Sequence, residues 1–202
     1  MSNFVELDGI RFRERTAASP AFLSNRNLEP LYNVACVVRA FAAIQAEHPD
    51  ASLVIAGDGS QRAAIEQLVR NLGVRHVTLV GKIAPERMGE LYDAADVYLN
   101  APNIDNMPNS VIEAFAAGVP VVSSDAGGIP YVVTHEVTGL LSPCDDDVAL
   151  AANAVRVLRS PALASGMAAR AHEECMRRYV WPAVSTRWAQ LYRALMARKA
   201  LA

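Results

Sequence analysis

Short apolar runs alternate with longer segments whose apolar residues recur at helical spacing along the first 143 residues. In residues 32–48, for example, the spacing of Val37, Phe41 and Ile44 predicts a helix with one buried face. The predicted strands are residues 21–25, 51–59, 76–81, 96–102, 119–125 and 139–143, and the predicted helices between them are residues 32–48, 61–73, 84–95 and 109–118. This alternation predicts an α/β fold, a Rossmann-like, doubly wound parallel sheet of about six strands.

After Pro143 the pattern changes to consecutive amphipathic helices, which we expect at residues 145–158, 161–179 and 182–199. The last helix carries an apolar stripe at helical spacing, formed by Val184, Trp188, Leu191, Tyr192 and Leu195. The stripe must be buried either on this domain or on another domain or subunit, and both alternatives stay open. We interpret the aromatic residues of this tail as core residues, namely Tyr179, Trp181, Trp188 and Tyr192. The chain is therefore read as one domain, residues 1–202, with a linker-like lead-in at 1–19 and C-terminal helices at 161–202.

Composition excludes several classes of protein. The 202-residue chain has a formal net charge of −2 and no dense basic run, which argues against nucleic-acid binding. The three cysteines lack the spacing of a disulfide framework or a zinc site. No apolar run is long enough to span a bilayer, and the first residues do not resemble a signal peptide. We expect a soluble protein of the cytoplasm, or one held peripherally at the inner face of the membrane.

Candidate binding residues cluster after the predicted strands, where a doubly wound sheet binds its ligands. The helix starting near Asn109, capped by Asn109 or Ser110, would aim free N–H groups at a phosphate. Glu113, one turn further on, could accept hydrogen bonds from ribose hydroxyls, and Asp105 from hydroxyls on the other side of the phosphates. This pattern describes a nucleotide sugar. A simpler alternative makes Glu113 a partly buried acid paired with the backbone or Arg26, and Asp105 a turn residue.

The segment DNMPNSVIEAFAAGVPVVSSDAGGIPYVV, residues 105–133, resembles the acid-x7-Glu signature of retaining glycosyltransferases of family 4. Residues 2–12, 51–73, 77–102 and 138–143 resemble other motifs of that family in the expected order. The resemblance implies the GT-B fold, in which two Rossmann-like halves face each other, and makes this chain the C-terminal, donor-binding half. It also implies transfer of a sugar from a nucleotide-diphosphate sugar to an acceptor hydroxyl with retention, and a place in cell-envelope polysaccharide biosynthesis.

The resemblance assigns roles residue by residue. Arg26 and Asp105 would be the catalytic residues, with Arg26 neutralising the diphosphate as the glycosidic bond breaks. Asp105 would bind the donor sugar together with the backbone of Asn106, Met107 and Pro108. The phosphates would bind the N–H groups of Asn109, Ser110 and Val111. Glu113 would bind the ribose, and the backbone around Lys82 and Ile83 would border the base. The family's usual account needs no protein nucleophile, and we expect no cofactor and no metal ion.

The sequence departs from the family pattern at several positions. Asp105 stands where Glu is usual, Tyr32 where a diphosphate-binding Lys is common, and Tyr131 where many members have Glu. Because the resemblance covers only the C-terminal half of the family's fold, we expect this chain to lack the N-terminal, acceptor-binding half. We therefore expect donor binding without efficient transfer, and either the missing N-terminal domain or a partner chain on the last helix. The acceptor would be a glycan, a lipid or a small molecule.

Two other motifs have simpler explanations. GDGSQR has Arg62 at the third glycine position of a dinucleotide fingerprint, which argues against an NAD site. The run Cys144–Asp147 is better read as a helix cap than as a metal site. Besides the glycosyltransferase, a nucleotide-sugar epimerase and a non-catalytic nucleotide-sugar-binding or interaction module remain as alternatives.

Overall fold

The structure is a computed structural model that describes residues 4–7, 9–15 and 20–199. Its core is a six-stranded parallel sheet in the order β3-β2-β1-β4-β5-β6. The strands are β1 (Ala21–Ser24), β2 (Ser52–Ala56), β3 (Val77–Gly81), β4 (Val97–Asn100), β5 (Val121–Ser124) and β6 (Leu140–Ser142). The strand order reverses between β1 and β4, so the loops that follow these two strands flank the switch point of the sheet. The predicted doubly wound sheet is confirmed.

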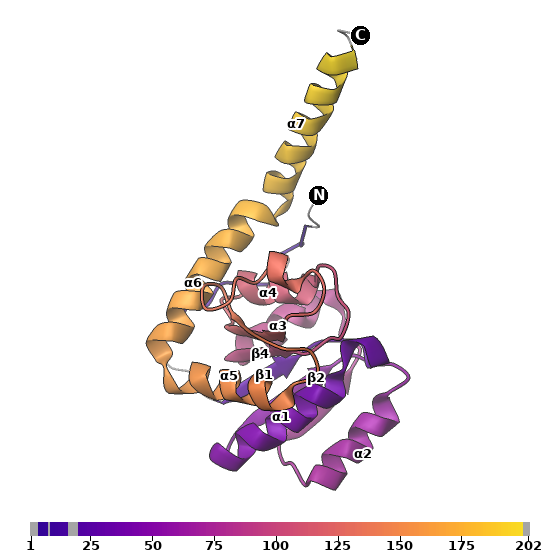
Figure 1. Cartoon of the computed structure of the whole chain (residues 1–202), viewed down its shortest axis with the longest axis vertical. Coiled ribbons are helices and arrows are strands. Elements are labelled where there is room, and N and C mark those ends of the chain that lie inside the picture. The colour runs from indigo at the N-terminus through magenta and orange to yellow at the C-terminus, as the bar shows by residue number, and fades with distance from the viewer. Residues whose placement is uncertain (1–3, 8, 16–19, 200–202) are drawn as a thin grey trace.

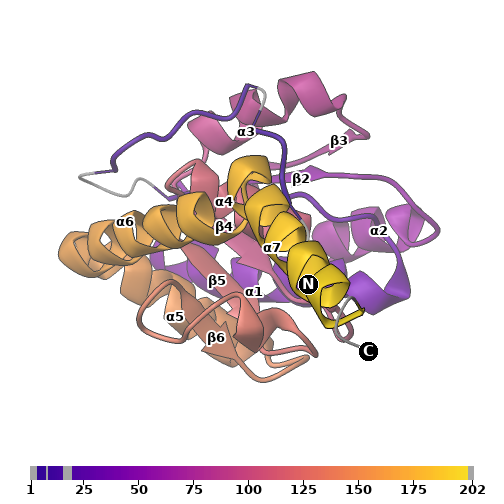
Figure 2. The ribbon, with the colours of Figure 1, turned by 90° about the horizontal axis from the view of Figure 1, so that it is seen from above.

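Helices cover both faces of the sheet, as Figures 1 and 2 show. They are α1 (Val34–Glu47), α2 (Arg62–Leu72), α3 (Met88–Ala94), α4 (Asn109–Ala116), α5 (Asp147–Arg159), α6 (Pro161–Arg178) and α7 (Trp181–Lys199), with short 3₁₀ turns at Pro30–Tyr32, Pro85–Arg87 and Ile129–Tyr131. α1, α2 and α5 pack on one face, where Phe41 and Ile44 join the buried side chains of β2. α3, α4 and α6 cover the other face around Phe115. Apolar burial on both faces explains the continuous apolar strands in the sequence.

Two local expectations are met at helix ends. Gly73 ends α2 in the left-handed conformation, with φ of 65°. Asp146 caps α5, because its side chain accepts a hydrogen bond from the Ala149 N–H at 2.8 Å. The acidic run before α5 thus has a structural role in forming that helix.

The described part of the lead-in is fastened to the domain. The Val5 N–H donates to the carbonyl oxygen of Tyr179 at 2.9 Å. The buried guanidinium of Arg15 donates to the carbonyl oxygens of Tyr92, Ala95 and Ala117 at 2.7–2.9 Å. These contacts hold residues 4–7 and 9–15 against α3, α4 and the end of α6.

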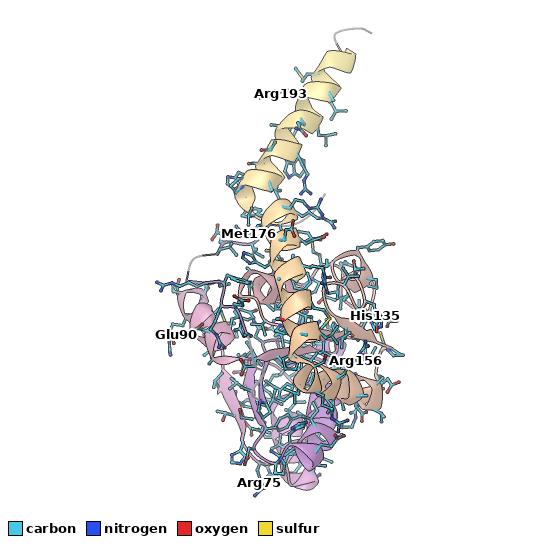
Figure 3. The ribbon with its side chains drawn as sticks, turned by 90° about the vertical axis from the view of Figure 1, so that its left-hand side faces the viewer. Arg75, Glu90, His135, Arg156, Met176 and Arg193 are labelled. Carbon is cyan, nitrogen blue, oxygen red and sulfur yellow. The ribbon has the colours of Figure 1, made fainter. Side chains whose placement is uncertain are left out.

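The last helix, α7, leaves the body of the domain (Figure 1), and Arg193 lies on its projecting part in Figure 3. Val184 is buried, but the rest of the apolar stripe is 39% exposed at Trp188 and 59% at Tyr192. The expectation of a core for the tail aromatics is correct for Tyr179 and wrong for the other three. Trp181 is exposed although it begins α7, and Trp188 and Tyr192 lie beyond the first turns through which α7 packs on the domain. Within the described part of the chain, no helix combines the length and apolar character that a bilayer span requires.

Candidate functional site at the start of α4

The N-terminus of α4 lies at the carboxyl edge of β4, next to the switch point. Pro108 occupies the N-cap position, and its carbonyl oxygen accepts from the Val111 N–H at 3.1 Å. Two expectations are therefore wrong. Neither Asn109 nor Ser110 caps the helix, and the Val111 N–H is not a free donor. Because Pro108 already holds Val111, the N–H groups of Asn109 and Ser110 are the ones outside the helix's own hydrogen bonds.

Backbone contacts between loops fix the position of Asp105. The Gly128 N–H, in the loop after β5, donates to the carbonyl oxygen of Asp105 at 2.7 Å. A Cβ added to Gly128 would lie 1.8 Å from the carbonyl oxygen of Asn106, so only glycine permits this approach. On the other side, the Asn103 N–H donates to the carbonyl oxygen of Leu31 at 2.9 Å. The loops after β1, β4 and β5 thus meet, as the sequence predicts.

Arg26 lies at the centre of this meeting point. Its guanidinium forms an ion pair with Asp105, and its Nη1 donates to the Ser110 hydroxyl at 3.0 Å. Only 9% of the Arg26 side chain and 10% of the Asp105 side chain are exposed. Asp105 is consequently more than a turn residue, because it balances a nearly buried cation.

Tyr32 occupies the position where the family resemblance leads one to expect Lys. The Arg26 guanidinium lies over the Tyr32 ring, 4.1 Å from the ring centroid. A cation over an aromatic face is attracted by the ring quadrupole. Where the family commonly has a second cation, this chain therefore has an aromatic ring that stabilises the guanidinium of Arg26.

Glu113 is half-buried on α4, and its Oε2 accepts from the Tyr92 hydroxyl at 2.8 Å. Burial raises the pKa of Glu113, while the hydrogen bond from Tyr92 and the charge of Arg26 act in the opposite direction. The ion pair with Arg26 that the simpler alternative offered is formed by Asp105, and Glu113 is paired with a tyrosine. Tyr92 was missed in the sequence, where its segment reads as an ordinary helix.

Three cavities follow one another along this edge of the sheet. The first, about 410 Å³, lies beside Glu113 and Asn109. The second, about 220 Å³, lies between Arg26 and the Lys82–Ile83 backbone, and shares Met88 with the first. The third, about 360 Å³, shares Lys82 with the second. The lining residues of the first cavity that the sequence did not single out are Phe4, Val5, Glu6, Ile10, Pro85, Glu86 and Met88.

The arrangement suits an extended, anionic ligand with hydroxyl groups. Arg26 and the first N–H groups of α4 favour an anion, since a helix N-terminus carries partial positive charge. The carboxylates of Glu113, held by Tyr92, and Asp105, paired with Arg26, belong to the same group of residues and can accept hydrogen bonds. Among residues 4–7, 9–15 and 20–199, no three His, Cys, Asp or Glu side chains gather closely enough to hold a metal ion.

The family model for glycosyl transferases group 1 matches residues 10–174 of the chain. The chain belongs to this glycosyltransferase family. Its sequence is 32% identical over 167 residues to N-acetyl-alpha-D-glucosaminyl L-malate synthase of Bacillus anthracis, covering 82% of this chain and 43% of that protein. It is 31% identical over 166 residues to phosphatidyl-myo-inositol mannosyltransferase of Mycolicibacterium smegmatis, covering 81% of this chain and 42% of that protein.

Solved structures agree with this assignment for the fold. Sucrose-phosphate synthase from Thermosynechococcus elongatus superposes with a TM-score of 0.83 and 28% identity, over 97% of this chain and 52% of that one. Anabaena HepE, solved in complex with UDP-glucose, superposes with a TM-score of 0.80 and 21% identity, over 89% of this chain and 50% of that one. This glycosyltransferase chain thus has the Rossmann-like fold of one half of a GT-B protein. It spans about half of each of these two structures and less than half of the two relatives named above.

Proposed function

We propose that residues 1–202 of this glycosyltransferase form a single domain that binds the nucleotide-sugar donor of a retaining sugar transfer. One observation carries the proposal, namely the convergence of Arg26, Asp105 and Glu113 around the first turn of α4. A diphosphate would lie between Arg26 and the N–H groups of Asn109 and Ser110. The structure of HepE with UDP-glucose supports a ligand of this class, because its fold is the same.

The other residues of the site would bind the nucleoside and the sugar, which lie at the two ends of the donor. Glu113 would accept hydrogen bonds from the ribose hydroxyls, and the cavity beside Lys82 and Ile83 would take the base. Asp105, with the backbone from Asn106 to Pro108, would hold the sugar. Since Asp105 is paired with Arg26, binding of the donor would exchange part of that ion pair for contacts with the diphosphate.

In the transfer itself, the acceptor oxygen would bond to the anomeric carbon on the face from which the diphosphate leaves. The bond between that carbon and the phosphate oxygen breaks, and the acceptor's proton passes to a phosphate oxygen. Arg26 and the helix N–H groups would stabilise the charge that develops on the leaving group. The proposed step uses no protein nucleophile, cofactor or metal ion.

The acceptor, a glycan, lipid or small molecule, would be presented by an N-terminal domain or partner chain seated on α7. The exposed stripe from Trp188 to Leu195 gives that partner an apolar surface. Relatives named for phosphatidyl-myo-inositol mannosyl transfer and lipopolysaccharide core biosynthesis support a place in cell-envelope polysaccharide biosynthesis, in the cytoplasm or at the inner face of the membrane.

Calorimetric titration with UDP, GDP and ADP, and then with their sugar conjugates, tests the proposal. We expect one diphosphate to bind, and Glu113→Ala and Arg26→Ala each to lose at least tenfold in affinity, because hydrogen bonds to charged groups contribute about 1.5–3 kcal/mol. Glu136→Ala and Arg156→Ala, which break an exposed ion pair elsewhere, serve as matched controls. Failure of the unmodified chain to bind any of these ligands would refute the proposal and favour an interaction module.

A further inference from the structure

Tyr92, on α3, is a fully buried tyrosine whose hydroxyl meets three polar groups, one from the loop after β1 and two from α4. The side-chain amide of Asn25, which follows β1, donates to the Tyr92 oxygen at 2.8 Å. The carbonyl oxygen of Ser110, in the first turn of α4, lies 3.0 Å from it. Glu113 Oε2 lies 2.8 Å away. The hydroxyl therefore joins the β1 loop to the helix that carries the candidate anion site.

Hydrogen-bond counting at this hydroxyl limits what Glu113 can do. A tyrosine hydroxyl has one proton to donate, and both Ser110 O and an ionised Glu113 accept. When Glu113 is ionised, Tyr92 can satisfy only one of the two acceptors at a time. When Glu113 carries a proton on Oε2, Glu113 donates to Tyr92 and Tyr92 donates to Ser110 O, so all contacts are satisfied.

The second carboxylate oxygen of Glu113, Oε1, accepts no hydrogen bond from the part of the chain that the structure describes, and Glu113 lines the 410 Å³ cavity. An ionised Glu113 that gives Oε2 to Tyr92 still has Oε1 for a ligand. A vicinal diol in the cavity would supply donors to Oε1, which compensate the buried carboxylate while Tyr92 donates to Oε2.

We propose that Tyr92 is a positioning residue that orients the Glu113 carboxylate toward the ribose diol of the donor. The inference rests on the proposed function and extends it to a residue that does not itself touch the ligand. The hydroxyl of Tyr92 orients the side chain of Glu113 by its hydrogen bond to Oε2. The side-chain amide of Asn25 in turn orients the hydroxyl of Tyr92. The ribose is thus recognised by an assembly of three elements, although only Glu113 contacts its hydroxyl groups.

Affinities for a ribonucleoside diphosphate and its 2′,3′-dideoxy analogue, measured by calorimetry, test this role. In the unmodified chain the ribonucleotide should bind more tightly, and Tyr92→Phe should reduce that preference about tenfold, as expected for one hydrogen bond to a charged group. Affinity for the dideoxy analogue should change little. Tyr179→Phe is the matched control, since Tyr179 is equally buried and its hydroxyl has no partner among the described residues.

A second variant and a second measurement separate the possible results. In a Glu113→Ala background, Tyr92→Phe should have no further effect on the preference for the diol, because the residue acts through Glu113. Carbon-13 NMR titration of the Glu113 carboxyl should show a higher pKa in Tyr92→Phe than in the unmodified chain, since the ionised form loses a donor.

The outcomes for the two proposals differ. If the unmodified chain binds no nucleotide, the proposed function fails and the role of Tyr92 fails with it. If it binds the ribonucleotide preferentially but Tyr92→Phe keeps the full preference, or leaves the Glu113 titration unchanged, only the positioning role is overturned.

Discussion

Gly128→Ala should destabilise the protein and disable the site through a purely steric effect. The backbone at Gly128 has φ of −86° and ψ of −4°, a conformation that alanine adopts readily. The added Cβ, however, would lie 1.8 Å from the oxygen and 2.6 Å from the carbon of the Asn106 carbonyl group. Because these are backbone atoms, no side-chain rotation relieves the overlap, and the loop after β4 must move.

The size of the effect follows from two terms. Overpacking of a rigid site costs about 1–3 kcal/mol. Displacement of the loop also weakens the 2.7 Å hydrogen bond from Gly128 to Asp105, which adds roughly 1 kcal/mol. We expect the free energy of unfolding to fall by about 2–4 kcal/mol in total. Nucleoside diphosphate affinity should fall at least tenfold, since the loop after β4 leads directly into α4 and its movement displaces the N–H groups of Asn109 and Ser110 from Arg26.

Urea denaturation measures the free energy of unfolding. Calorimetric titration of the folded variant, in a separate experiment without urea, measures its affinity for the nucleoside diphosphate. Gly73→Ala is the matched control, because Gly73 has φ of 65° and open space around its Cβ position. That substitution carries a conformational cost of about 1 kcal/mol and leaves the loop after β4 in place. The reasoning would be refuted if Gly128→Ala were as stable as Gly73→Ala and bound nucleotide equally well.

Three further substitutions test other parts of the structure. Burial raises the pKa of Glu113, so the folded state holds a proton longer than the unfolded state and stability falls as pH rises from about 4. In urea denaturation, Glu113→Gln should therefore be more stable than the unmodified chain at pH 7, and the difference should be smaller near pH 4. If the two proteins had equal free energies of unfolding at both pH values, this reasoning would be contradicted. Arg15→Ala removes donors to four backbone carbonyl oxygens and should lower the free energy of unfolding by about 3–5 kcal/mol, whereas Arg156→Ala should change it by less than about 0.5 kcal/mol. Asp105→Asn releases Arg26 from its ion pair, so calorimetry should show tighter binding of the nucleoside diphosphate. The attached sugar should add no affinity in this variant, because Asp105 is the residue that would hold it. Weaker binding of the diphosphate would argue against an exchange of partners at Arg26.

The sequence by itself determined the elements and their order. Hydrophobic periodicity is a local property. Within the part of the chain that the structure describes, it located the strands and the α-helices, because strands and helices bury apolar residues at different spacings, but it did not locate the 3₁₀ turns at Pro30–Tyr32 and Ile129–Tyr131. The end of α2 at Gly73 and the cap of α5 at Asp146 were equally readable, since both depend on residues within one turn. The positions of Asp105 and Glu113 at the start of α4 followed from their spacing along one short segment.

Only the tertiary structure decided what these residues contact. Arg26 and Asp105 are 79 positions apart, and Tyr92 and Glu113 are 21 apart, so their pairing depends on where the loops after β1 and β4 and the helix α3 come together. The same holds for the approach of Gly128 to Asn106, which no local pattern encodes. The apolar stripe of α7 shows the complementary case. Its periodicity predicts a helix with a face to bury, but whether this domain buries that face depends on the direction in which α7 leaves α6.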